Sequence, residues 1–240
     1  MMQQLAFNFH LNKFSRFEDF YGDSNKQLLA YLNTFIRPDN HERFIYLWGK
    51  PAVGKTHLLQ ACCHQSHHDG RRVFYLSFNK IDDFMPELLE NVDAFSLICL
   101  DDVDLLNKVA DKHRARDWEI AIFNLYNRLQ DNNDSKLIVA AGKPARQLDF
   151  SLKDLTSRLQ SGVVFEVKPL AETSKRDALK NYAQQHGFEL PGKTIDFLLR
   201  HQKRDMQTLM QTLTRLEQAS LSYQRRLTVP FVKEVLETWR

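Results

Sequence analysis

Cysteine, glycine and proline are all scarce in this chain of 240 residues, which contains 3, 8 and 7 of them respectively. The three cysteines, Cys62, Cys63 and Cys99, cannot build the disulfide framework that stabilises small secreted domains. The low glycine and proline content excludes a collagen-like or low-complexity chain. An apolar content of 43% predicts instead a globular protein with a substantial core.

Long apolar runs and a large charge of one sign are missing as well. No apolar run reaches the roughly 20 residues of a membrane-spanning helix, and the N-terminus lacks the basic-then-apolar layout of a secretory signal. The net charge of +3 is too small to predict strong nucleic-acid binding by itself. We therefore expect a cytoplasmic protein without membrane contact, whose contact with DNA is indirect or weak.

Strand-like apolar runs alternate with helical patterns until about residue 168. The runs lie at 44–48, 73–77, 97–101, 137–141 and 163–167. Strands separated by helices predict an α/β fold with a parallel five-stranded sheet between helices. Beyond Pro169 only helical periodicity follows, over 172–186, 194–202, 204–222 and 229–239. We expect a tail over 1–11, an α/β base domain over 12–168 and a small all-α domain over 169–240.

One stretch matches a phosphate-binding loop, G-x-x-x-x-G-K-[ST], at every required position. Its residues are Gly49, Lys50, Pro51, Ala52, Val53, Gly54, Lys55 and Thr56. Gly54 lets backbone N–H groups point at phosphate oxygens, Lys55 reaches the outer phosphates, and the Thr56 hydroxyl suits Mg²⁺. An apolar strand precedes the loop and a helical pattern follows it, so a chance match is the weaker interpretation. The stretch predicts binding of ADP or ATP with Mg²⁺.

A second apolar run, 97–100, ends in two carboxylates, Asp101 and Asp102. P-loop folds hold the hydration shell of Mg²⁺ with a carboxylate at the C-terminal end of a buried strand. Asp101 is therefore predicted to share the metal site with Thr56, and Asp102 is the candidate base that polarises an attacking water. An acidic turn without a catalytic role is the alternative.

Six segments form a more particular pattern across nearly the whole chain. They read "YLWGKPAVGKTHLLQACC", "SLICLDDVD", "WEIAIFNLYNRLQ", "KPARQLDFSLKDLTSRLQSG", "GFELP" and "RRLTVPFVKEVLE". In these segments the chain resembles the AAA+ ATPases of the replication-initiator group, and among them the Hda group of DnaA inactivators. The resemblance implies an AAA+ base domain followed by a helical lid. Because the sequence stops at Arg240, we expect no DnaA-type DNA-binding domain after the lid.

The resemblance also implies roles for individual residues. Arg158, in "LTSRLQSG", matches the arginine finger that reaches a nucleotide on a neighbouring subunit, although the sequence alone favours an ordinary solvated helix residue there. A guanidinium suits the implied task because it is always charged and binds phosphate oxygens in pairs. The nucleotide site extends, by the same resemblance, to the adenine-lining segment and to two further positions: Phe20, Tyr21, Gly22, His57 and Gln207.

The sequence departs from the family pattern at three positions. Ala52 stands where AAA+ proteins often have glycine, Gly142 where relatives place a polar sensor residue, and Gln207 where the lid usually carries a sensor arginine. Arg204, three residues earlier, is a candidate substitute for that arginine. Loss of both sensors removes groups that would read a γ-phosphate. We therefore predict that ADP binds at least as well as ATP and that intrinsic hydrolysis is slow.

The segment "QLAFNF" near the N-terminus places apolar side chains on a segment that we expect to be an unpacked tail. Apolar residues exposed in this way indicate a partner groove, although folding back onto the protein's own surface is the alternative. The segment resembles the motif by which Hda proteins bind the replication sliding clamp, the β subunit of DNA polymerase III. The implied contacts to the clamp come from Gln4, Leu5, Phe7 and Phe9.

The function that the resemblance implies is negative regulation of replication initiation. An ADP-bound protein of this kind binds the DNA-loaded clamp and promotes hydrolysis of the ATP held by DnaA, acting through its arginine finger. An autonomous AAA+ ATPase that serves as helicase loader or transposition helper is the alternative. A nucleotide-gated scaffold without effect on DnaA is a third interpretation. The sequence leaves open the oligomeric state, including a homo-oligomer.

Overall fold

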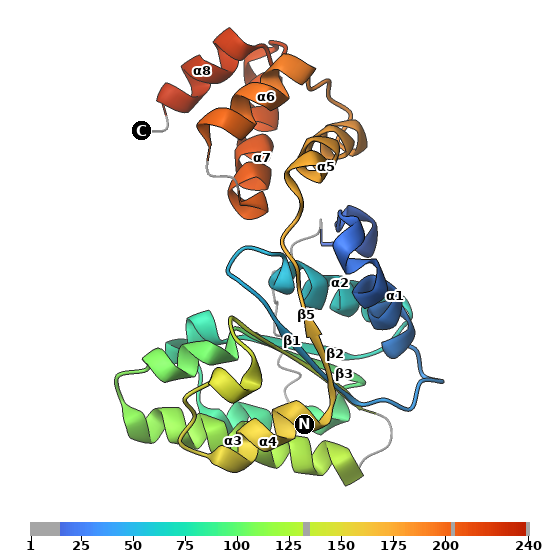
Figure 1. Ribbon diagram of the computed structural model, residues 1–240, viewed down its shortest axis with the longest axis vertical. Helices are drawn as coiled ribbons and strands as arrows, with labels where there is room; N and C mark the ends of the chain where they lie inside the picture. Colours follow the sequence, from blue (N-terminus) through green and yellow to red (C-terminus); the bar gives the residue numbers. More distant parts are fainter. Residues whose placement is uncertain (1–14, 132–134, 203–204, 239–240) are drawn as a thin grey trace, which may run out of the picture. The chain divides into compact units, whose positions relative to one another are not determined.

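The computed structural model describes residues 15–131, 135–202 and 205–238 (Figure 1). The predicted clamp contacts Gln4, Leu5, Phe7 and Phe9 lie outside these residues, as does Arg204. The chain divides into two compact units. The first comprises the described part of Met1–Phe20 with Asn25–Pro51 and Lys55–Lys168, and the second comprises Pro169 onward with Tyr21–Ser24 and Ala52–Gly54.

A five-stranded sheet forms the centre of the first unit. Its strands are β1 (Phe44–Trp48), β2 (Val73–Ser77), β3 (Leu97–Asp101), β4 (Lys136–Ala141) and β5 (Val163–Glu166). Every pairing is parallel and the order is β2-β3-β4-β1-β5. The predicted α/β fold with a parallel five-stranded sheet is confirmed. Because β1, β3 and β4 run in one direction, their carboxyl ends meet at the same edge of the sheet.

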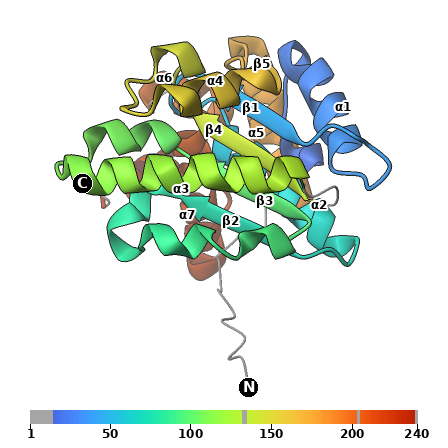
Figure 2. The ribbon, with the colours of Figure 1, turned by 90° about the horizontal axis from the view of Figure 1, so that it is seen from below.

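Helices cover both faces of this sheet (Figures 1 and 2). Helices α1 (Lys26–Phe35) and α2 (Lys55–His68) lie on one face, and α3 (Lys112–Asp131) and α4 (Lys153–Ser161) lie on the other. The core between the sheet and α3 includes Trp118, which is fully buried and meets the Phe78 ring edge-on at 5.3 Å. Parallel strands that are apolar on both sides must be covered on both faces, and these two layers of helices provide that cover.

Cys62 and Cys63 lie on α2 and Cys99 lies on β3, and all three cysteines are free and fully buried. Burial raises the pKa of the Cys62 and Cys99 thiols well above the ordinary value. Within the described part of the chain, no group of three or more His, Cys, Asp or Glu side chains is placed to hold a metal ion. No helix among the described residues is long and apolar enough to cross a membrane.

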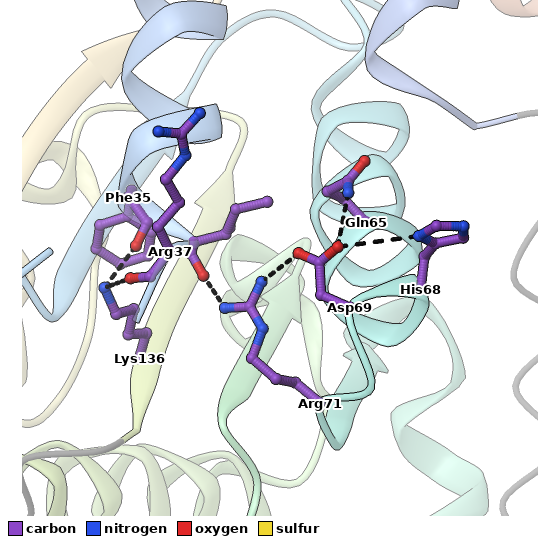
Figure 3. Close-up of polar contacts among 8 residues, drawn as sticks. Phe35, Arg37, Gln65, His68, Asp69, Arg71 and Lys136 are labelled. Carbon is purple, nitrogen blue, oxygen red and sulfur yellow. Dashed lines mark hydrogen bonds and ion pairs between the residues drawn. The ribbon is translucent and has the colours of Figure 1, made fainter. Parts of the chain in front are cut away.

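Two basic side chains satisfy the carbonyl groups at the C-terminal end of α1 (Figure 3). The Lys136 ammonium is buried and donates to the carbonyl oxygens of Phe35, Arg37 and Asn40 at 2.6, 2.8 and 2.7 Å. Arg71 donates to the carbonyl of Ile36. The last carbonyls of a helix have no partner within the helix, so cations at this end stabilise it by hydrogen bonding and through the helix dipole.

The second unit is helical among its described residues. Its helices are α5 (Glu172–Gln185), α6 (Gly192–His201), α7 (Met206–Tyr223) and α8 (Val229–Glu237). They share an apolar core that includes Leu179, Leu198, Leu213 and Phe231. The Asp205 carboxylate accepts a hydrogen bond from the Thr208 N–H at 2.8 Å and so caps the N-terminus of α7. The predicted all-α region after the sheet is confirmed.

Candidate nucleotide-binding site

The predicted phosphate-binding loop connects the end of β1 to the start of α2. Gly54 has a φ of 102°, and Ala52 has a φ of 61°, which an alanine adopts at a cost of about 1 kcal/mol relative to glycine. The Lys55 side chain is buried, and its ammonium donates to the carbonyl oxygens of Gly49 at 2.9 Å and Lys50 at 3.2 Å. The lysine therefore curls back onto the loop that bears it, beside the N-terminal end of α2, where an anion is favoured.

The Asp101 carboxylate lies at the end of β3 and is fully buried. Its Oδ2 accepts a hydrogen bond from the Tyr75 hydroxyl at 2.9 Å, and its Oδ1 has no hydrogen-bond partner among the described residues. Burial raises the pKa of Asp101, while the nearby Thr56 hydroxyl, the hydrogen bond from Tyr75 and the charge of Lys55 oppose that rise. The structure thus brings Lys55, Thr56 and Asp101 together, and their roles at a nucleotide and a metal ion stay predictions.

The donor set around Asp101 fits a magnesium ion. A buried carboxylate oxygen without a partner is costly unless a cation or a water occupies its open side. Magnesium usually keeps several waters and binds through one or two protein groups together with phosphate oxygens. Thr56 and Asp101 are the residues that would hold it, and the bound ion would neutralise phosphate charge.

Asp102 follows directly and has a left-handed backbone, with a φ of 57°. Burial and the neighbouring Asp101 carboxylate raise the pKa of Asp102 to about 6. A carboxyl group with a pKa near neutrality can exchange a proton with water at physiological pH. Its role as a base stays a prediction.

A third carboxylate, Asp104, lies near Asp102 and was not predicted from the sequence. Its Oδ1 accepts a hydrogen bond from the N–H of Gly142 at 2.7 Å, just beyond the end of β4. A Cβ atom added at Gly142 would lie 2.9 Å from Asp104 Oδ2, so the carboxylate occupies the space of a side chain there. The only sequence signal for Asp104 is its place in the acidic run "DDVD".

The predicted adenine-lining residues lie in both units. In the first unit, the Phe20 ring lies 5.7 Å from the ring of His57, and His57 Nε2 makes a 2.8 Å hydrogen bond to the carbonyl oxygen of Arg16. In the second unit, Gly22 has a φ of 109°, and a Cβ there would lie 2.5 Å from Leu170 Cδ1, so the position requires glycine. Tyr21 lies beside it. Gln207 lies on α7, and its side chain is outside the described atoms.

Arg158 lies on α4, at the end of β1 that is remote from the phosphate-binding loop. Its guanidinium lies over the rings of Tyr126 and Phe123, with centroid distances of 5.6 and 5.9 Å. Tyr126 in turn stacks on Phe44, the first residue of β1, at 3.8 Å. The loop begins only after the last residue of that five-residue strand, about 13 Å further along at roughly 3.3 Å per residue. The structure does not bring Arg158 to its own chain's loop.

Two protein-family models match the chain. The bacterial DnaA ATPase domain matches residues 11–166, and the Hda lid domain matches residues 172–236. Together they cover the sheet-containing region and the helical region that follows it. The first match alone extends over more than half of the chain.

Solved structures share the fold at low sequence identity. AMPPCP-bound DnaA from Aquifex aeolicus is 24% identical, with a TM-score of 0.69 over 85% of this chain and 65% of that one. Domain III of DnaA from Thermotoga maritima is 18% identical, with a TM-score of 0.78 over 95% and 97%. The Thermotoga maritima RuvB branch migration motor is 15% identical, with a TM-score of 0.67 over 93% and 72%. This chain thus spans about two thirds of the Aquifex chain and nearly all of the isolated domain III.

Proposed function

The chain belongs to the DnaA-related AAA+ family, and from that membership we propose that it is a negative regulator of replication initiation. In this proposal it binds ADP with Mg²⁺ and stimulates hydrolysis of the ATP that DnaA holds. The match of residues 172–236 to the Hda lid domain supports this role over that of an initiator.

The observation that carries the proposal is the position of Arg158. It is half-buried, always charged, and held against two aromatic rings by cation–π contacts. It lies far from its own loop, so a phosphate group that it contacts belongs to another chain. A guanidinium supplied by a partner stabilises the charge that develops during phosphoryl transfer, and it accelerates hydrolysis by roughly 10³–10⁵-fold in GTPases.

In this mechanism the chain's own nucleotide is a structural ligand. The loop backbone and Lys55 would bind the phosphates, and Thr56 and Asp101 would hold the metal, which would supply positive charge there. Gly142 has no side chain at one sensor position and Gln207 has no charge at the other, so neither position supplies the group that would distinguish ATP from ADP. The bound nucleotide therefore fixes the conformation of the protein, and Arg158 acts on the nucleotide of DnaA.

The proposal includes binding to the sliding clamp through Gln4, Leu5, Phe7 and Phe9, which precede the described residues. We expect Gln4→Ala/Leu5→Ala to abolish binding to the clamp while leaving ADP binding unchanged. Surface plasmon resonance on immobilised clamp measures the first, and calorimetric titration measures the second. Equal clamp binding by the double variant and the wild type would remove the tail from the proposal.

The decisive experiment compares Arg158→Ala with the wild type in hydrolysis of DnaA-bound ATP on DNA-loaded clamps. We expect loss of nearly all stimulation, with ADP and clamp binding within twofold of the wild type. Arg158→Lys keeps the charge without the paired donors and should restore little. Arg146→Ala, which removes an exposed arginine of the same unit, is the control. Full stimulation by Arg158→Ala would refute the mechanism.

A further inference from the structure

The segment Ser15–Phe20 is fastened to α2 by side chains that the phosphate-binding mechanism does not use. The Ser15 side chain is buried, and its hydroxyl donates to Gln60 Oε1 at 2.8 Å. One residue later, the carbonyl of Arg16 meets His57 Nε2 at 2.8 Å. Apart from the short 3₁₀ turn Phe17–Asp19, the segment has no regular structure of its own. Contacts to α2 therefore determine its position.

The two α2 residues are placed to act together. His57 and Gln60 are three positions apart, so they lie on one face of the helix. His57 also directly follows Thr56, in the first turn of α2. The same helical turn thus carries the groups for phosphate and metal and the group that holds the segment ending in Phe20.

The protonation state of His57 follows from its partner. A carbonyl oxygen only accepts hydrogen bonds, so Nε2 must be the donor. With Nε2 as the donor to the Arg16 carbonyl, the ring lies beside Phe20 at a centroid distance of 5.7 Å, with the two ring planes tilted by 49°.

We propose that His57 and Gln60 are positioning residues for base recognition. They fix Phe20 relative to the phosphate-binding turn, so that one ligand contacts both. This inference rests on the proposed nucleotide site and assigns His57 a role other than contact with phosphate. It implies that the two residues contribute to the part of the affinity that comes from the base and not to the part that comes from the phosphates.

Two ligands separate these parts of the affinity. ADP carries base and phosphates, whereas inorganic pyrophosphate carries the phosphates alone. In His57→Phe, which keeps an aromatic ring beside Phe20 but removes the donor, we expect the Kd for ADP to rise about tenfold, as for the loss of roughly one hydrogen bond. The Kd for pyrophosphate, measured by competition, should stay within twofold. Gln60→Leu should behave alike with a smaller effect.

Variants outside the phosphate-binding turn keep the test decisive if the α2 variants misfold. Ser15→Ala removes the same link from the opposite side and leaves α2 intact, and it should raise the Kd for ADP about threefold without changing that for pyrophosphate. His57→Gln, whose amide can donate to the Arg16 carbonyl, should recover part of the affinity. His67→Ala alters an exposed histidine of the same helix and is the matched control.

The outcomes are distinct. A selective loss for ADP supports the positioning role. Parallel losses for ADP and pyrophosphate would show that His57 maintains the phosphate-binding loop and would overturn the inference, as would unchanged binding of both ligands. These titrations contain neither DnaA nor clamp, so failure of the proposed regulatory function leaves them unaffected. A wild type that binds neither ligand would overturn the proposed nucleotide site itself.

Discussion

Asp104 takes up the space beside Gly142 where a sensor side chain would lie. Oδ1 of Asp104 accepts a hydrogen bond from the Gly142 N–H, and Oδ2 lies 2.9 Å from the position that a Cβ atom on residue 142 would occupy. A residue with a side chain can enter only if Asp104 rotates and gives up that hydrogen bond. At the residue scale, the glycine at the expected sensor position thus occurs together with a carboxylate, Asp104, that fills the space of the absent side chain.

We predict that Gly142→Ala lowers the free energy of unfolding by about 1 kcal/mol, because it breaks the hydrogen bond to Asp104 and crowds its Oδ2. In the Asp104→Ala background the same substitution should cost little, since the crowding oxygen is gone. Urea unfolding of the two single variants and the double variant forms a double-mutant cycle that measures this coupling. Strictly additive effects would contradict the assignment.

Asp102 should make stability depend on pH. Its pKa rises from 3.8 in the unfolded chain to about 6 in the folded protein, so between these values the folded state binds more protons. The carboxyl group therefore favours folding at low pH, and that contribution is lost as the pH rises through about 6. Asp102→Asn cannot ionise, and we expect it to raise the free energy of unfolding by about 1 kcal/mol at pH 7.5.

At pH 4 the same Asp102→Asn substitution should change stability little, because Asp102 is then protonated in the folded protein. Urea unfolding at both pH values measures the difference. Asp177→Asn, which alters an exposed carboxylate on α5, is the control and should show no such pH dependence. An equal effect of Asp102→Asn at both pH values would argue against a raised pKa.

At the scale of elements, the ends of α1 are fixed by distant side chains. The Asn25 side chain, at the start of the helix, donates to the carbonyl of Lys168 at 2.8 Å and accepts from its N–H at 2.9 Å. Lys136 and Arg71 bind the carbonyls at the other end (Figure 3). Burial lowers the pKa of Lys136 to about 8, so the ammonium form still predominates at neutral pH.

We predict that Lys136→Met destabilises the protein by about 2–4 kcal/mol, because three carbonyl oxygens lose their donor together. Amide hydrogen exchange should accelerate most in α1 and in residues 36–40, which those bonds hold. Lys143→Met removes an exposed lysine shortly after β4 and should change neither stability nor exchange. Uniformly faster exchange across the sheet would indicate a general loss of packing instead.

The strands were predictable because each is a short apolar run with the composition of a doubly covered sheet. The structure of residues 78–94 was not predictable, because arginines from distant parts of the sequence donate to the backbone carbonyls there. Arg114 donates to the carbonyls of Ile81, Asp82 and Phe84, and Arg128 donates to that of Leu89. These contacts join residues about 30 or more positions apart and leave no local pattern. The resulting 3₁₀ turns therefore have no periodicity to recognise.

The same distinction holds in the candidate site. Lys55, Thr56 and Asp101 follow from local motifs, since a phosphate-binding loop and an acidic strand end specify their own surroundings. The contacts from Ser15 and Arg16 to α2, and from Asp104 to Gly142, arise only when separate segments meet in the fold. Residues that belong to a local motif could be predicted from the sequence. Contacts between segments that are far apart in the sequence could not.

For the whole molecule, we predict slow intrinsic hydrolysis and no preference for ATP, because position 142 carries no side chain and position 207 carries an uncharged glutamine in place of the sensor arginine. The Kd for ADP should equal or fall below that for AMPPCP in calorimetric titrations with Mg²⁺. Phosphate release in the absence of partners should stay near background, and Lys55→Ala should abolish binding of both nucleotides. Robust steady-state turnover would favour an autonomous helicase loader or transposition helper instead.

The complete burial of all three thiols has a practical consequence for observing the protein at work. Cys62, Cys63 and Cys99 are inaccessible, and burial raises the pKa of the Cys62 and Cys99 thiols and so disfavours the reactive thiolate there. Maleimide dyes should therefore leave the native chain unlabelled. One cysteine introduced at an exposed position such as Ser222 would then be the only reactive site. Fluorescence from that label would report binding of clamp and nucleotide in real time, without removal of a native cysteine.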